Sequence, residues 1–337
     1  MTHPYTCHVD EVPESAFRVG KRLKIIGSIF LGVFFVSFLP LPYLPELNES
    51  IVSFVKLIWW AVLLGLFIGG LIEYFVPNGF IFKYMGQKKV SSIFYAVIAG
   101  FLMSACSHGV LAIAIQLYKK GASIPAVITF LLASPWANLP VTILLFSFFG
   151  LKAIIFIAAA MFIALLTGFV YMGLQQLGLV ERSQTVSVLE EYEWSNVKNF
   201  NLGKSVRNVA AGSLRLANMV LWWLLIGFLI AVFIRAYVPA EILMQYFGPT
   251  MSGLFLTLLF ATIIEVCSEG SSPIAFEIFA KTGALGNPFV FLMAGVATDY
   301  TEIGLIWTNI GKRAAIWLPI ITVPQIIAFA ILFNAML

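Results

Sequence analysis

Nine apolar runs occupy most of this 337-residue chain. Most of them exceed the length of about 20 residues that a helix needs to cross a bilayer. Charged residues make up only 11% of the chain, whereas a soluble domain carries about 25%. A soluble enzyme and a disordered protein are therefore excluded, and the sequence predicts an all-α polytopic membrane protein. The runs lie at 25–45, 51–76, 91–118, 122–149, 152–178, 213–237, 251–281, 285–310 and 314–336.

The Lys and Arg residues predict which loops face the cytoplasm, because cytoplasmic loops carry an excess of them. Four basic residues precede the first run and place the N-terminus in the cytoplasm. Loop 83–89 and linker 181–212 are basic and lie inside, whereas loop 238–250 has no Lys or Arg and lies outside. Three runs separate the two inside segments, so one of them must be re-entrant. Runs 91–118 and 122–149 are the candidates, because each has a polar break in its middle. Non-helical backbone at membrane depth is tolerated only where it is buried in protein or lines a water-filled cavity.

The two halves of the chain share motifs at a nearly constant spacing of 161 to 163 residues. A fixed period is the signature of an internal repeat. Corresponding loops differ in charge, which favours inverted repeats with interrupted helices and a site at the midplane, as in many secondary transporters. Parallel repeats are the alternative. The matched motifs include Trp59-Trp60 with Trp222-Trp223, Val76-Pro77 with Val238-Pro239, Gly86 with Gly248, Gly121-Ala122 with Gly283-Ala284, and Phe130-Leu131 with Phe291-Leu292.

The repeat and the charge distribution together divide the chain into five parts. Sixteen charged residues fall in the two stretches 1–24 and 181–215, which interrupt the apolar sequence. The predicted parts are a cytoplasmic N-terminal tail at 1–24, an extra span with an outer loop at 25–50, a first transmembrane repeat at 51–178, a cytoplasmic polar linker at 179–212, and a second transmembrane repeat at 213–337.

The polar breaks of the two repeats are the candidate substrate site. One pair of breaks reads Cys-Ser-His-Gly in the first half and Cys-Ser-Glu-Gly in the second. A free Cys is often only a small buried apolar residue, but two symmetric thiols within polar breaks favour a soft ligand. The predicted substrate-binding residues are Cys106, Ser107, His108, Gly109, Ser134, Asn138, Cys267, Ser268, Glu269, Gly270, Thr298 and Asp299. Cys106, His108 and Cys267 are the candidate ligands of a soft metal.

Ionisable residues at membrane depth are costly and point to function. Glu265 and Glu269 are four residues apart and share a helix face if that stretch is continuous. Together with His108, whose imidazole titrates near neutral pH, they are the predicted proton carriers. Glu277 and Lys281 have the same spacing and are expected to pair near a helix end.

Other chemistries leave no signal in the sequence. Gly203-Lys204-Ser205 resembles the end of a phosphate loop, but Lys198 stands where that motif requires Gly. No zinc-protease helix or nucleophile elbow occurs. We therefore expect no enzyme activity, no cofactor and no nucleic-acid partner. The expected partners are the lipid bilayer and a small soft metal, metalloid or organometalloid substrate. The sequence is also compatible with a homo-oligomer.

Several of these motifs resemble the predicted permease family that includes the ArsP-type organoarsenical efflux permeases. The resemblance rests on Cys106–Gly109, Lys120–Ser123, Phe130–Pro135 and the second-half segment Cys267–Asp299, and it covers about residues 50–337. It implies a multi-span inner-membrane efflux protein for trivalent organoarsenicals or other soft species. The family's first motif usually reads Cys-Ser-Cys-Gly, and His108 replaces its second Cys. Ser134-Pro135-Trp136 likewise replaces a Thr-Pro-Glu or Thr-Pro-Gln sequence.

The sequence as a whole predicts a secondary transporter of the plasma (inner) membrane. The leading hypothesis is proton-coupled efflux of a soft metal, metalloid or organoarsenical species through a site between the repeats. A carrier or channel for a small anion is one alternative, although the clustered acids argue against it. A membrane subunit that anchors or assembles partners through the polar linker is the other.

Overall fold

Every regular element that the structure describes is a helix. The structure is a computed structural model that describes residues 19–39, 41, 43–75, 90–102, 107–119, 121–137, 139–181, 202–264 and 268–336. The helices are α1 (Lys21–Val36), α2 (Leu44–Phe75), α4 (Val90–Leu102), α5 (Ser107–Lys119), α6 (Ile124–Ala137), α7 (Leu139–Phe149), α8 (Lys152–Gln176), α10 (Leu202–Tyr237), α11 (Ala240–Phe247), α12 (Met251–Ile264), α13 (Ser268–Thr282), α14 (Gly286–Ala297), α15 (Tyr300–Asn309) and α16 (Lys312–Ala335).

Five helical stretches among the described residues are long and apolar enough to cross a membrane, and two bent helix pairs raise the number to as many as seven. Lipid offers no hydrogen bonds, so a crossing backbone must satisfy its own polar groups as helix. The prediction of an all-α polytopic membrane protein is confirmed. The five stretches are Leu44–Ile68, Lys152–Gln176, Val220–Tyr237, Gly286–Asn309 and Lys312–Ala335.

Polar breaks divide several of the long apolar runs into shorter helices. Run 122–149 becomes α6 and α7, which meet at a bend of 46°. Run 285–310 becomes α14 and α15, which are separated at Thr298 and Asp299. The chain turns after α5 and after α13 at Gly121 and Gly283, whose φ angles of 97° and 70° favour glycine.

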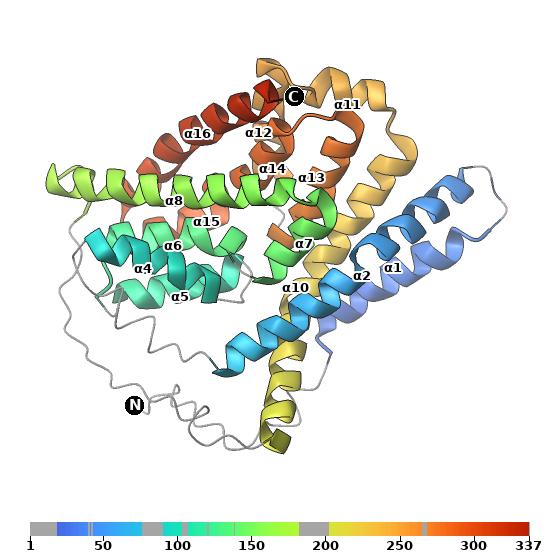
Figure 1. Cartoon of the computed structure of the whole chain (residues 1–337), viewed down its shortest axis with the longest axis horizontal. Coiled ribbons are helices and arrows are strands. Elements are labelled where there is room, and N and C mark those ends of the chain that lie inside the picture. Colours follow the sequence, from blue (N-terminus) through green and yellow to red (C-terminus); the bar gives the residue numbers. More distant parts are fainter. Residues whose placement is uncertain are drawn as a thin grey trace.

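The two longest helices, α2 and α10, lie side by side and run antiparallel. Near one end, the hydroxyl of Tyr237 donates to the carbonyl oxygen of Tyr43 at 2.9 Å. Near the other end, the hydroxyl of Ser205 donates to that of Tyr74 at 3.4 Å. The rings of Phe54 and Phe228 meet between these ends, 5.5 Å apart. Figure 1 shows the two helices crossing at a shallow angle, with α1 beside them.

The last helix of each half, α8 and α16, also pair in antiparallel fashion. Tyr171 near the end of α8 donates its hydroxyl to the carbonyl of Ala314 near the start of α16, at 2.6 Å. Phe156 near the start of α8 contacts Phe333 near the end of α16, with ring centroids 5.9 Å apart. In Figure 1, α4, α5 and α6 lie below α8, whereas α12 and α16 lie above it.

The core is continuous across both halves and is densest around α6 and α14. Residues 121–136 are all buried, as is nearly all of α14. Large apolar side chains elsewhere are exposed, such as Leu63 and Ile263, which suits a lipid-facing surface. The two central helices therefore hold the predicted Ser134 and Thr298 breaks inside protein.

The N-terminal helix α1 is 16 residues long, shorter than the predicted run 25–45 and than the span of about 20 residues. It packs along α10. The backbone N–H of Gly20 donates to Asn218 Oδ1 at 2.8 Å, and the rings of Phe30 and Phe228 lie 5.3 Å apart. These contacts place α1 parallel to α10.

Candidate functional site

Glu269 occupies the first turn of α13 and is 4% exposed. The hydroxyl of Ser268 donates to Glu269 Oε2 at 3.1 Å. A carboxylate in the first turn of a helix also interacts favourably with the helix dipole. This acid is therefore buried at the start of α13, and its role in a site stays a prediction.

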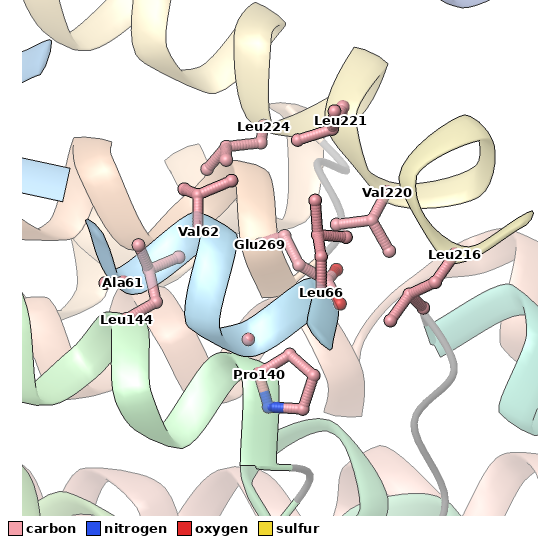
Figure 2. A pocket seen from close by; sticks show the side chains of 11 residues that line it. Ala61, Val62, Leu66, Pro140, Leu144, Leu216, Val220, Leu221, Leu224 and Glu269 are labelled. Carbon is pink, nitrogen blue, oxygen red and sulfur yellow. The ribbon is translucent and has the colours of Figure 1, made fainter. Parts of the chain in front are cut away.

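An apolar pocket lies in front of Glu269, between α2, α7, α10 and α13. Its volume is about 30 Å³, which is room for one or two water molecules. Figure 2 shows the Glu269 carboxylate beside Leu66 of α2 and Val220 of α10. Among the described residues of the lining, Glu269 is the only charged one. The others are Ala61, Val62, Gly65, Leu66, Pro140, Leu144, Leu216, Val220, Leu221 and Leu224.

Two glycines allow the helices around this pocket to approach closely. A Cβ atom on Gly227 of α10 would overlap the carbonyl of Gly270 on α13. A Cβ atom on Gly65 of α2 would lie 3.0 Å from the Cα of Pro140 on α7. Small residues at helix interfaces allow such contact in membranes, and here they bring the first turn of α13 against the α2–α10 pair.

The predicted break in the second half forms a compact polar junction between α14 and α15. Asp299 is 5% exposed and accepts a hydrogen bond from the backbone N–H of Glu302 at 2.9 Å, so it caps α15. The hydroxyls of Thr298 and Thr262 lie 2.7 Å apart and link the junction to α12. These predicted residues therefore have structural partners, and none of them lines the Glu269 pocket.

The corresponding break in the first half contains two buried polar groups that form no hydrogen bond with the described part of the chain. Ser134 is fully buried in α6, and its hydroxyl has no partner. The indole N–H of Trp136, which is 2% exposed, also has none. Buried polar groups are nearly always paired, so this end of α6 has free hydrogen-bonding capacity. Trp136 also lines a cavity of about 10 Å³ against α8 and α14.

Several predicted site residues lie outside the described residues: Cys106, Asn138, Glu265 and Cys267. Ser107, His108 and Gly109 form the start of α5, but the structure does not describe their side chains. Among the residues that it does describe, no group of three His, Cys, Asp or Glu side chains could hold a metal ion. The predicted soft-metal ligands therefore stay a prediction.

The expected pair of Glu277 and Lys281 does not form. Arg235 of α10 is the ion-pair partner of Glu277, at 3.8 Å. Lys281 instead donates to backbone carbonyls of residues 234, 235 and 238. The sequence analysis did not predict the apolar wall from α2 and α10, although it matched the Trp pairs that these two helices carry.

The fold defines a class, that of helical polytopic membrane proteins. A family model described as "Predicted permease" matches residues 43–335, and the chain belongs to this family. The family description names a permease and not an enzyme.

Two relatives cover most of the chain. "UPF0718 protein YcgR" of Bacillus subtilis is 23% identical over 279 residues, which is 80% of this chain and 90% of that protein. A "Putative two-component membrane permease complex subunit" of Streptococcus mutans is 24% identical over 245 residues, 72% of this chain and 79% of that protein. No solved structure matches significantly.

Proposed function

We propose that this protein couples proton movement to efflux of a small soft metal, metalloid or organoarsenical species across the plasma (inner) membrane. The observation that supports it is the buried Glu269 carboxylate in a pocket between α2 and α10. A buried ionisable residue inside a membrane protein is a candidate for proton transfer or cation binding, and both belong to a coupled transporter.

The two thiols supply the argument for a soft cargo. Cys106 immediately precedes α5, and Cys267 immediately precedes α13, the helix that begins beside Glu269. Thiolates prefer soft ions. In this proposal Cys106 and Cys267 bind the cargo, whereas Glu269, Glu265 and His108 carry protons.

The antiparallel pairs support an arrangement of two inverted repeats. α2 and α10 carry the matched Trp pairs, and they run in opposite directions. α8 and α16 end the two halves and do the same. The proposed repeats at 51–178 and 213–337 then meet along both helix pairs, and transport follows from movement of one half against the other.

Transport by the purified full-length protein in proteoliposomes tests the proposal. The panel contains a trivalent organoarsenical, arsenite, soft metal ions and labelled oxyanions, each with and without a pH gradient. We expect gradient-driven movement of a soft species only. Glu269→Gln should lower the driven rate to that of protein-free vesicles, and Cys106→Ala with Cys267→Ala should abolish binding of the cargo. Glu49→Gln, at an exposed position of α2, is the matched control.

Two outcomes of this panel would contradict the proposal. Movement of oxyanions alone would identify an anion carrier. Full transport of a soft species by the double cysteine variant would exclude thiol ligation.

A second function is favoured by the streptococcal relative, whose name describes a complex subunit. In this alternative the chain assembles with a partner through the polar linker at 179–212. Deletion of the linker residues 184–198 would then abolish function in cells, while Glu269→Gln would have no effect. If the chain is the proposed transporter, deletion of these linker residues should leave function intact, whereas Glu269→Gln should abolish it.

A further inference from the structure

Glu277 is the second buried carboxylate of α13, two helical turns beyond Glu269. It is 1% exposed, and its Oε1 atom accepts no hydrogen bond from any residue that the structure describes. A buried carboxylate oxygen normally has hydrogen-bond partners, and a buried charge without close compensation is costly. Glu277 therefore calls for an explanation beyond packing.

The ion pair with Arg235 is loose. Arg235 Nη1 lies 3.8 Å from Glu277 Oε1, which is beyond hydrogen-bond distance. The Arg235 side chain is 38% exposed, and its guanidinium lies over the ring of Phe54, 5.2 Å from the centroid. The guanidinium can thus leave the carboxylate for solvent without losing a tight hydrogen bond.

Lys281, one turn further along α13, is committed elsewhere. Its ammonium donates to the carbonyl oxygens of Ile234 at 2.9 Å, Arg235 at 3.0 Å and Val238. Ile234 and Arg235 belong to the last turn of α10, and Val238 follows its end. Helix ends leave carbonyl groups without full intrahelical pairing, and the Ile234 carbonyl accepts from the backbone N–H of Val238 as well. Lys281 therefore holds the ends of α10 and α13 together and leaves Glu277 without a hydrogen bond.

The other charged groups near Glu277 disfavour binding of a metal cation at this carboxylate. Lys152 of α8 lies over the ring of Phe279, 4.7 Å away, and Glu241 of α11 is exposed. The helices α7 and α14, which also pack against α13, contain no charged residue. The nearest charges are thus mainly positive and disfavour any cation at Glu277. Burial acts in the opposite direction for a proton alone, because it favours the neutral, protonated carboxyl group, and a proton needs no cavity.

We propose that Glu277 is a proton-binding site at the end of the bundle where α10 meets α11. Glu277 Oε1 takes a proton from a hydronium ion at that end, so that an O–H bond forms, a water molecule is left, and the ion pair with Arg235 breaks. The guanidinium then turns to solvent, while the Lys281 ammonium keeps its hydrogen bonds to the end of α10. Release of the proton restores the ion pair. Proton binding itself is independent of the cargo, and only its use in transport rests on the proposed function.

Infrared difference spectra of the purified full-length protein, recorded between neutral and acidic pH without any cargo, test this site. We expect a carbonyl stretching band of a protonated carboxyl group on acidification. Glu277→Gln should remove that band, and Glu277→Asp should keep it at a shifted frequency. Glu241→Gln, at an exposed acid near the same end, should leave it unchanged. Identical spectra for the parent protein and Glu277→Gln would overturn the proposal.

Arg235→Gln tests the competition between the guanidinium and the proton. Without the positive charge, the Glu277 band should be present at pH values at which the parent protein lacks it. An unchanged titration would refute the role of Arg235. These spectra need no cargo. A negative infrared result would therefore contradict the proton site at Glu277, whereas a negative transport panel would contradict the proposed function.

Discussion

Gly227 has no room for a methyl group, because α10 passes against the backbone of α13 at this point. We expect Gly227→Ala to lower the stability by about 1–3 kcal/mol, the usual cost of overpacking. The obstacle is the carbonyl of Gly270, so one helix must move and carry Glu269 away from its pocket. Thermal unfolding in detergent and the transport assay measure the two effects.

Gly173 of α8 is the matched control for this substitution. A Cβ atom there meets nothing within 4 Å, and alanine is favoured over glycine in a helix by about 0.5–1 kcal/mol. Gly173→Ala should therefore keep or raise the unfolding midpoint. Equal midpoints of thermal unfolding for the parent protein and Gly227→Ala would show that α10 and α13 are not in contact at Gly227.

At the scale of single residues, the sequence predicted which polar side chains are buried better than it predicted which groups they contact. Glu269 lies within an apolar run at a repeated polar motif, so its burial could be foreseen. Spacing along one helix suggested that Glu277 and Lys281 pair. Their actual partners belong to α10, and the crossing of two helices is not encoded in the spacing along one.

At the scale of elements, Glu181 caps the start of α16 from a distant part of the chain. Its Oε1 accepts from the backbone N–H of Arg313 at 2.8 Å, and its Oε2 accepts from that of Ala314 at 3.0 Å. Initial N–H groups of a helix have no partner in the helix itself. Glu181 thus fixes α16 to the end of α8.

Glu181→Ala leaves both N–H groups without their acceptor and removes a charge that favours the helix start. We expect a loss of about 1–2 kcal/mol, the typical cost of a lost cap. A lower midpoint of thermal unfolding would report it, and Glu49→Ala on the exposed side of α2 should leave the midpoint unchanged. A midpoint equal to that of the control would show that the cap is dispensable.

Helix interruptions were predictable, but helix ends were not. Pro, Gly and polar residues marked the junction of α6 with α7 and that of α14 with α15. By contrast, α2 begins at Leu44 within the predicted outer loop, and α10 begins at Leu202 within the predicted linker. Apolar length marks only the part of a helix that lies in lipid, whereas backbone hydrogen bonds continue into polar sequence.

At the scale of the whole molecule, the matched motifs indicated that α2 and α10 are equivalent, and loop charge favoured opposite directions. The two helices run antiparallel in the structure, and the repeat itself stays a prediction. The sequence did not reveal that the two helices contact each other directly, because the contacts between their ends are made by ordinary apolar side chains such as Phe54 and Phe228. Matched motifs point to a repeat, whereas helix contact depends on the shape of the two surfaces.

The antiparallel course also yields a prediction about sidedness. α10 runs from the basic segment near residue 202 to the loop 238–250, which has no Lys or Arg. The excess of basic residues belongs to the cytoplasmic side. A cysteine at the exposed Glu241 should therefore react with a membrane-impermeant maleimide in intact cells. A cysteine at Val206, which is also exposed, should react only after permeabilisation.

Labelling is measured as the increase over the parent protein, because three native cysteines are present. Reaction of both cysteines in intact cells would mean that α10 does not cross the membrane, which would remove the basis for inverted repeats. Reaction of Val206→Cys alone in intact cells would show that the protein has the opposite orientation in the membrane to the predicted one. The antiparallel α2–α10 pair would survive that result, since it depends on contacts within the bundle and not on its orientation in the membrane.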